Sequence, residues 1–277
     1  MGIRINTNVA SLAAQRNLGI TNNALKDNFA KLSSGSRITK ASDDAAGLAI
    51  SEKLRAQIRG IRQAKRNAED GISLIQTAEG GLQEISNIVI RLRELAIQAA
   101  SDTVGNTERS FTDVEFQSLK DEVQRIAMVS EFNGRKLLNG TGGLVEVQVG
   151  IYNDAFQDRL KFDSSAIDAT LEALGIAAEG ISTKEGAQIS LQALDDALVK
   201  INGNRAELGA LQNRLGSIVN TQGINDENLS AANSRIRDVD VATETADLTK
   251  NSILNRAGVS VLTQANASPE AALKLIG

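Results

Sequence analysis

The chain contains neither cysteine nor histidine among its 277 residues, and it has no tryptophan. These absences exclude thiolate nucleophiles, histidine general bases, zinc sites of the Cys/His type and every disulfide. Aromatic residues make up only 3% of the chain, although a globular core of this size usually contains more rings, because each ring buries a large apolar area. Pro269 is the one proline, so almost nothing interrupts long helices. The composition therefore favours elongated helices.

The chain also lacks a strong net charge and a long apolar run. Its formal net charge is −4, which argues against broad nucleic-acid binding, although residues 1–40 carry six cations and one anion. No segment reaches the ~20 apolar residues that a membrane span needs. The start, MGIRINTNVASLAAQRN, has no apolar core and no small-residue cleavage site, so we expect no cleaved secretory signal. The sequence predicts no nucleic-acid partner and no membrane insertion.

What the chain does contain is Ala, Leu, Ile and Val at coiled-coil spacing. Over residues 45–100, apolar or small side chains recur in steps of three and four, with one shortened step. Residues 54–99 alone would form a helix about 70 Å long. A second run with its own shortened step covers residues 191–218. Charged residues occupy seam positions in both runs, Lys65 and Glu79 in the first and Arg205 in the second. Because their phase shifts match, we expect the two long helices to be able to run side by side.

A shorter helix and a strand-like region lie between these runs. Apolar spacing predicts the helix at residues 116–126, and alternating valines within residues 144–149 predict a small β-hairpin region near residues 141–165. The Gly-Thr-Gly-Gly sequence at residues 140–143 lacks the Lys-Ser/Thr ending of a phosphate-binding loop and precedes a strand. A plain turn is therefore the favoured interpretation of this segment.

Both chain ends carry narrower apolar stripes at helical spacing, and polar residues such as Asn22 interrupt them. A lone helix of this kind buries too little surface to offset its ordering entropy. We therefore hypothesise that both ends are largely disordered in the free chain and become helical when packed together. The expected fold is mainly α, with long antiparallel coiled-coil helices from both chain ends and one small β-hairpin region. The predicted core-assembly residues are Val9, Leu12, Leu18, Leu25, Phe29, Leu32, Leu254, Val261, Leu262, Leu273 and Leu275.

Several long blocks of sequence resemble one known family. The chain is similar to the N-terminal half of bacterial flagellin in INTNVASLAAQRNL, KLSSGSRITKASDDAAGLAISEKLRAQIRG, QAKRNAEDGISLIQTAEGGL, RLRELAIQAA and EFNGRKLLNG. It is similar to the flagellin C-terminal region in SRIRDVDVATETADLTKNSIL and LTQANASPEAALKLIG. The resemblance covers roughly residues 1–140 and 190–277, so the chain resembles a minimal flagellin without the large variable outer domains. The hook–filament junction protein has similar terminal helices, but the continuous match through the inner helices favours flagellin.

This resemblance implies a structural subunit that polymerises into the bacterial flagellar filament for motility, with no enzymatic activity and no cofactor. Residues 1–42 and 235–277 would form the filament core domain, and residues 43–234 the inner-tube helical domain. The implied location is extracellular, in the filament, after type III export without a cleaved signal peptide. The implied partners are further copies of the chain in a helical homopolymer, an export chaperone at the C-terminal region, and the filament cap and hook–filament junction proteins.

The implied joint between the two domains contains five charged residues. Asp43 and Asp44 precede an apolar helix, and helix capping is favoured over a metal-binding pair because adjacent residues on a helix do not face each other. Arg235, Arg237 and Asp238 have two open interpretations. They form either a solvated charged surface or contacts between subunits that set register.

Three further residues match positions that contact the animal flagellin-specific Toll-like receptor in the flagellins it senses. They are Arg91, Leu95 and Glu115, so the resemblance implies recognition of the monomer by a host receptor. The alternative is structural. Arg91 would then be a helix-surface cation, and Leu95 and Glu115 would hold the helix bundle or the filament interface.

Two other classes of protein fit parts of the sequence. A signalling or adaptor coiled coil would contain the same heptads, but it does not explain a hairpin between two helical halves or apolar stripes at both ends. An enzyme would need a catalytic set drawn from Asp, Glu, Lys, Arg, Ser, Thr or Tyr in a pocket, and long thin helices offer few concave sites. The sequence therefore favours a structural subunit.

Overall fold

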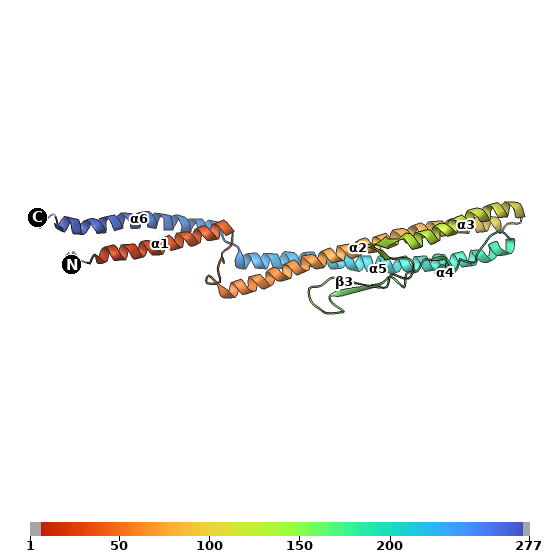
Figure 1. The fold of residues 1–277 in the computed structure, drawn as a ribbon, viewed down its shortest axis with the longest axis horizontal. Coiled ribbons are helices and arrows are strands. Elements are labelled where there is room, and N and C mark those ends of the chain that lie inside the picture. Colours follow the sequence, from red (N-terminus) through yellow and green to blue (C-terminus); the bar gives the residue numbers. More distant parts are fainter. Residues whose placement is uncertain (1–6, 274–277) are drawn as a thin grey trace. The chain divides into compact units, whose positions relative to one another are not determined.

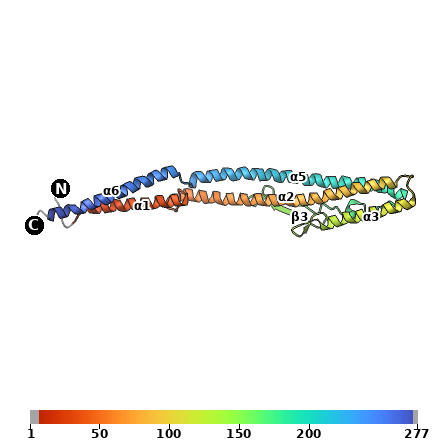
Figure 2. The same cartoon turned by 90° about the horizontal axis from the view of Figure 1, so that it is seen from above.

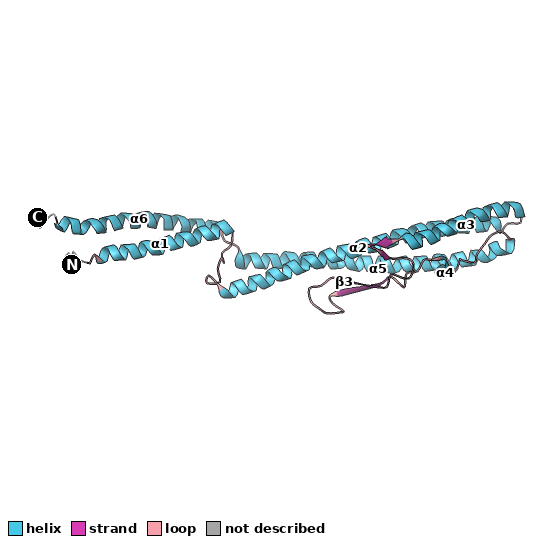
Figure 3. Ribbon diagram, in the orientation of Figure 1, coloured by secondary structure: helices cyan, strands magenta, loops and turns pink. Residues whose placement is uncertain are grey.

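The computed structural model describes the backbone of residues 7–273 and the side chains of residues 7–267. The chain divides into two compact units, one formed by the end segments up to residue 56 and from residue 228, the other by residues 57–227. Helices dominate both units (Figure 3), which confirms the mainly α fold. The elements are α1 (Val9–Ser34), α2 (Ala45–Ala99), α3 (Asn106–Val129), β1 (Glu131–Phe132), β2 (Arg135–Lys136), β3 (Leu144–Gln148), β4 (Arg159–Asp163), α4 (Leu171–Leu174), α5 (Lys184–Arg237) and α6 (Val241–Leu273).

In the first unit, helices from the two ends of the chain pack along each other. Figures 1 and 2 both show α1 beside α6. The pair is antiparallel, because Asn8 before the start of α1 contacts Ala265 late in α6, and Asn28 late in α1 contacts Glu244 in the first turn of α6. Helix α1 ends at Gly35, whose φ of 68° is the left-handed conformation that closes many helices. The predicted pairing of helices from the two chain ends is confirmed.

In the second unit, α2 and α5 lie side by side and antiparallel, as their matching phase shifts predicted (Figures 1 and 2). Arg93 Nε of α2 lies 2.6 Å from Asp195 Oδ1 of α5. Two of the charged seam residues also approach each other, with Arg205 Nη2 lying 3.8 Å from Glu79 Oε1. The buried heptad residues of α2 are Ile58, Ile61, Ala68, Ile75, Leu82, Ile85, Val89, Leu92, Ala96 and Ala99.

The predicted hairpin is present as β3 and β4, which pair antiparallel with Val145 opposite Phe162 and Val147 opposite Leu160. A second, shorter strand pair, β1 with β2, was not expected. It turns through Asn133 and Gly134, whose φ values are 51° and 76°. Asn-Gly between short strands is a strong hairpin signal, because both turn residues need positive φ, so the sequence did contain the information for this turn.

The turn between α2 and α3 is closed by Arg109, a cation that is only 6% exposed. Its guanidinium donates hydrogen bonds to the carbonyl oxygens of Ala99 and Ser101, at 2.7 and 2.8 Å, and to Asn106 Oδ1 at 2.8 Å. The carbonyl groups at the end of a helix lack partners within the helix and carry partial negative charge. Arg109 therefore caps the C-terminal end of α2 from within α3.

Candidate functional site

Polar side chains line much of the seam between α1 and α6. In α1, whose residues are all described, the buried side chains are Ser11 and Asn28. Ser11 Oγ donates to Asn266 Oδ1 at 2.7 Å, and Asn255 Nδ2 donates to Asn22 Oδ1 at 2.6 Å. Helix pairs in soluble proteins normally turn their apolar stripe inward. This pair instead places several of its amide and hydroxyl groups there.

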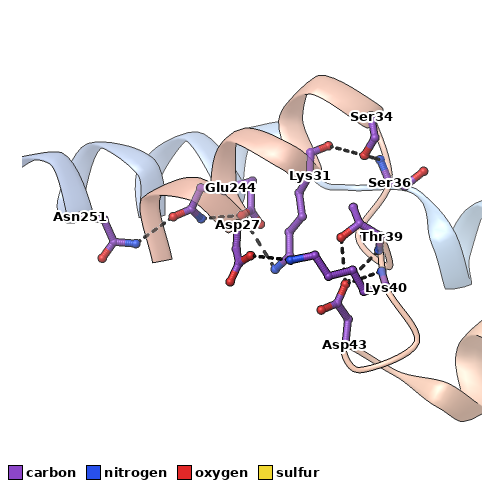
Figure 4. Close-up of polar contacts among 10 residues, drawn as sticks. Asp27, Lys31, Ser34, Ser36, Thr39, Lys40, Asp43, Glu244 and Asn251 are labelled. Carbon is purple, nitrogen blue, oxygen red and sulfur yellow. Dashed lines mark hydrogen bonds and ion pairs between the residues drawn. The ribbon is translucent and has the colours of Figure 1, made fainter. Parts of the chain in front are cut away.

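The most buried part of the seam is a cluster of four polar side chains. Asn28 Nδ2 donates to Glu244 Oε1, and Asn251 Nδ2 donates to Asn28 Oδ1 at 2.8 Å. Lys31 Nζ lies 3.9 Å from the same Glu244 oxygen. Figure 4 shows Lys31, Glu244 and Asn251 gathered where the two helices meet. Glu244 is only 9% exposed, and a carboxylate buried to this degree needs such partners to offset its desolvation.

Three predicted residues of α1, Leu18, Leu25 and Leu32, are half-buried in the first unit. Leu18 lies against Gly258 of α6, where a Cβ atom would be only 3.3 Å from Leu18 Cδ1. Leu262 is also half-buried. These leucines give the seam an apolar part between its polar contacts.

The other predicted assembly residues with described side chains are largely exposed. Phe29 is 59% exposed and Val9 is 65% exposed. The side chain of Leu273, and Leu275 as a whole, lie outside the described residues. The large apolar side chains left exposed on the pair are Val9, Leu12, Ile20, Phe29, Val241, Ile253, Leu254, Val259 and Val261.

Phe29 borders a groove of about 370 Å³ between the two helices. Exposed apolar side chains that border such a groove are typical of a surface that another molecule covers. The groove is lined by Leu25, Phe29, Leu248, Thr249, Ser252, Ile253 and Arg256.

The two segments that connect the terminal helices to α2 and α5 pair with each other through their backbones. Arg37 N donates to Arg237 O at 2.7 Å, and Val239 N donates to Gly35 O at 3.0 Å. The Arg37 guanidinium also donates to Ile236 O at 2.7 Å. The segment that follows α1 and the segment between α5 and α6 therefore lie side by side, although about 200 residues separate them in sequence.

The predicted joint residues lie at this place with different roles. Asp44 Oδ1 accepts a hydrogen bond from Gly47 N at 2.8 Å, so it caps the start of α2 as predicted. Arg237 donates to Glu52 of α2. Asp238 forms the antiparallel bridge with Ser36. Arg235 is exposed near the end of α5.

Asp43 caps the preceding turn and not the helix. Its Oδ2 accepts hydrogen bonds from Lys40 N, Thr39 N and Thr39 Oγ1, all at 2.9 to 3.0 Å (Figure 4). The backbone N–H groups of Lys40 and Thr39, followed by the Thr39 hydroxyl, hold the pKa of Asp43 below its ordinary value. Asp240, by contrast, caps the start of α6 itself. Hydrogen bonds from the Thr243 hydroxyl and then from the N–H groups of Thr243 and Ala242 lower its pKa.

The three predicted receptor-contact residues lie on or beneath the surface that α2 and α3 share. Arg91 of α2 donates to Glu94 at 2.9 Å and to Glu115 of α3, also at 2.9 Å. Hydrogen bonds to Glu94 and then to Glu115 raise the pKa of Arg91. Leu95 is only 2% exposed and belongs to the core of the second unit. Arg91 and Glu115 therefore form an exposed ion pair above a buried leucine.

Sequence reasoning missed the pairing of Asn28 with Glu244 and the buried position of Arg109. The interruption of the apolar stripe by Asn was a usable signal, because buried seam asparagines are common register markers. Among the described residues, no group of three or more His, Cys, Asp or Glu side chains could hold a metal ion. No helix within the described part of the chain has the length and apolarity to cross a membrane.

Comparison with known proteins finds flagellar relatives along nearly the whole chain. The family model of the bacterial flagellin N-terminal helical region matches residues 5–142, and that of the C-terminal helical region matches residues 191–276. Flagellin from Halalkalibacterium halodurans is 45% identical over 98% of this chain and 99% of its own length. The flagellar filament 33 kDa core protein of Treponema phagedenis is 43% identical with the same coverage. The crystal structure of Bacillus cereus flagellin is 34% identical, with a TM-score of 0.51 over 57% of this chain and 88% of that one.

Proposed function

The chain belongs to the bacterial flagellin family, and on that premise we propose that it is the non-enzymatic structural subunit of a flagellar filament for motility. Copies of the chain would polymerise into a helical homopolymer. The observation that carries this proposal is the apolar surface that α1 and α6 turn outward, away from their own seam. A second copy of the chain would cover this surface with a different part of its own, and repetition of such a head-to-tail contact, where the rotation does not close a ring, produces a helical filament.

The outward surface supports self-association for an energetic reason. Each large apolar side chain that leaves water contributes about 1.5–3 kcal/mol when it is fully buried. Phe29 and Leu254, from different helices, are among those exposed. The exposed members of the proposed core-assembly set, Val9, Leu12, Phe29, Leu254 and Val261, would therefore gain most of their burial between subunits.

The proposed domain arrangement follows the family. Residues 1–42 and 235–277 form the filament core domain, residues 43–234 form the inner-tube domain, and there is no outer domain. In support, residues 143–190 are all that lies between the two family matches. Asp43, Asp44, Arg235, Arg237 and Asp238 form the proposed joint between the domains.

We further propose that the terminal helices become ordered on assembly. Ordering a residue costs roughly 1–2 kcal/mol of backbone entropy, and α1 buries only Ser11 and Asn28 among its described side chains. The polar seam thus provides little of the apolar burial that would offset this entropy in a free subunit. Contacts with neighbouring subunits would supply the remainder.

The proposed partners also follow from exposed surfaces. An export chaperone would cover the apolar side chains of α6 before assembly, since exposed apolar helices aggregate. The subunit would be exported without a cleaved signal peptide and would assemble outside the cell. There the filament cap and the hook–filament junction proteins would contact it. A host Toll-like receptor would bind the exposed Arg91–Glu115 pair, with Leu95 supporting it from the core.

Seeded growth tests the proposed function. Purified chain is added to short filament fragments and followed by electron microscopy, with chain alone as the control. We expect long uniform fibres that extend from the fragments. Amide exchange on the same samples should show weak protection of residues 7–35 in the free chain and strong protection in fibres. A chain that stays solitary and is fully protected before any fibre forms would contradict both the polymer and the ordering step.

A further inference from the structure

The polar contacts between α1 and α6 form a ladder along the seam. From one end to the other, Ser11 contacts Asn266, Asn22 contacts Asn255, and Asn28 contacts both Asn251 and Glu244. Each rung joins residues more than 200 positions apart in the chain. The ladder is therefore a property of the pairing and not of either helix alone.

The seam leucines cannot align the two helices by themselves. Leu18, Leu25 and Leu32 on α1 are spaced by seven residues, and Leu248 and Leu262 on α6 by fourteen. A slide by one heptad superimposes the α1 leucines on themselves, and a slide by two heptads superimposes the two α6 leucines, so leucine spacing alone does not define one register. Apolar contacts are also non-directional. Some other contact must distinguish the observed register from its neighbours.

We propose that the polar ladder fixes the register of α1 against α6, and that replacing it with leucine would let the helices slide by a heptad. The proposal rests on the proposed function, because the assembled subunit is where a single register is required. It deepens that function by assigning a specificity role to Asn22, Asn28, Asn255 and Glu244. A polar residue at a coiled-coil seam specifies register at some loss of stability.

The sequence opposite Asn22 shows how a slide would be penalised. In the observed register Asn22 faces Asn255. A slide by seven residues in either direction would place Leu248 or Leu262 opposite Asn22. The asparagine amide would then lose its partner, and a leucine would face a polar group.

The buried cluster penalises a slide more strongly. Asn28 uses its amide nitrogen on Glu244 and its amide oxygen on Asn251 in the observed register. The seven-residue slide that brings Leu248 opposite Asn22 would carry Glu244 one heptad along α1, away from Asn28 and Lys31 and toward Thr21 and Ala24. A buried carboxylate that loses its hydrogen-bond donors is among the most destabilising changes in a protein interior.

Introduced cysteine pairs would report the register directly, because the chain has no cysteine of its own. The native pair is Leu18→Cys with Gly258→Cys, at the contact where the two helices approach closely. The slipped pair is Leu18→Cys with Ala265→Cys. Positions 258 and 265 are about 10 Å apart along a helix, and a disulfide needs Cα atoms within about 7 Å. Each pair therefore closes in one register only: the slipped pair reports the slide that brings Leu262 opposite Asn22, and the opposite slide is seen as a loss of native closure.

The two pairs are introduced into the unmodified chain, a leucine-seam variant and a control variant. The leucine-seam variant, called the leucine seam below, carries Asn22→Leu, Asn28→Leu, Glu244→Leu and Asn255→Leu. The control adds the same number of leucines at exposed positions of the same helices. Its substitutions are Asn17→Leu, Asn23→Leu, Asp247→Leu and Gln264→Leu.

Disulfide closure within one chain is read after mild oxidation of filaments, as the faster-migrating monomer on a denaturing gel. We expect the native pair to exceed the slipped pair at least tenfold in the unmodified and control chains. In the leucine seam the ratio of slipped to native closure should rise at least tenfold. An unchanged ratio in the leucine seam would overturn the register role. Where a variant does not form filaments by itself, the same ratio is read in filaments that it forms together with an excess of unmodified chain.

This readout separates the register proposal from the filament proposal. If the unmodified chain does not extend seeds but amide exchange shows α1 and α6 ordered in the free chain, the proposed function and the ordering step fail, and the cysteine ratio in that ordered free chain still decides the register. Normal growth of uniform fibres by the leucine seam, with native closure only, would leave the proposed function intact and reject the ladder as its register device.

Discussion

Phe29→Ser tests whether the outward face of α1 contributes to subunit addition. A phenylalanine side chain buries about 150–250 Å² when fully covered, and Phe29 is 59% exposed in the first unit. About 120 Å² therefore remains for a neighbouring subunit to cover, which is worth about 3 kcal/mol at roughly 25 cal/mol per Å². Since about 1.4 kcal/mol corresponds to a tenfold change in an equilibrium constant, we expect the critical concentration for seeded growth to rise about 100-fold.

The assay is sedimentation of seeded filaments at increasing subunit concentration, with the supernatant concentration read at the plateau. Serine and phenylalanine have similar helix propensities, so the substitution acts through the side chain and not through the helix. Asn23→Ser, at an exposed polar position of the same helix, is the matched control and should leave the plateau unchanged. A rise of less than about threefold for Phe29→Ser would refute the assignment of this face to a subunit contact.

Three further predictions concern the two units. Arg109→Met should lower the urea midpoint of residues 57–227 by about 1–2 M, because about 3 kcal/mol of charged hydrogen bonding at the end of α2 is lost. Asp43 should titrate below its ordinary pKa of 3.8 in a carboxyl NMR titration, so its contribution to stability is present above the unfolded-state pKa and is lost as the pH falls through the lower, folded-state pKa. Deletion of residues 235–277 should abolish seeded growth but leave residues 57–227 helical by circular dichroism.

For each of these three predictions, one result would contradict the reasoning. Arg125→Met is the control for Arg109, since Arg125 forms an exposed pair with Glu122 of a kind that contributes little, and equal midpoints for the two variants would reject the capping role. A carboxyl of Asp43 that titrates at or above its ordinary pKa would contradict its hydrogen bonds to the preceding turn. Loss of helicity throughout the truncated chain would favour an ordinary single bundle over two units.

The two units differ in where their apolar side chains point. In residues 57–227, Leu82, Ile85, Val89 and Leu92 of α2 are completely buried, so this unit has a core of its own. In the terminal pair, Phe29 is among the large apolar side chains that remain exposed. Under the proposed function, residues 57–227 fold around their own core, and the terminal pair gains stability when neighbouring subunits cover its exposed apolar side chains.

Much of this fold follows from local sequence. Steps of three and four predicted α2 and α5, because an apolar stripe must lie on one face of a helix for that helix to pack. Alternating valines predicted β3, because successive side chains of a strand point to opposite faces. The sequence also placed Glu79 and Arg205 at seam positions of two helices, and the structure shows that these two residues pair with each other.

The orientation of the terminal helices was settled by tertiary structure alone. The sequence showed apolar stripes containing Val9, Leu12 and Phe29, but in the folded chain these side chains remain more than half exposed while Asn28 meets Glu244. Spacing along one helix defines its faces and says nothing about which face meets a partner more than 200 residues away. That choice depends on the free energy of both surfaces together, and a buried carboxylate with its donors in place can outweigh an apolar stripe that other molecules are able to cover.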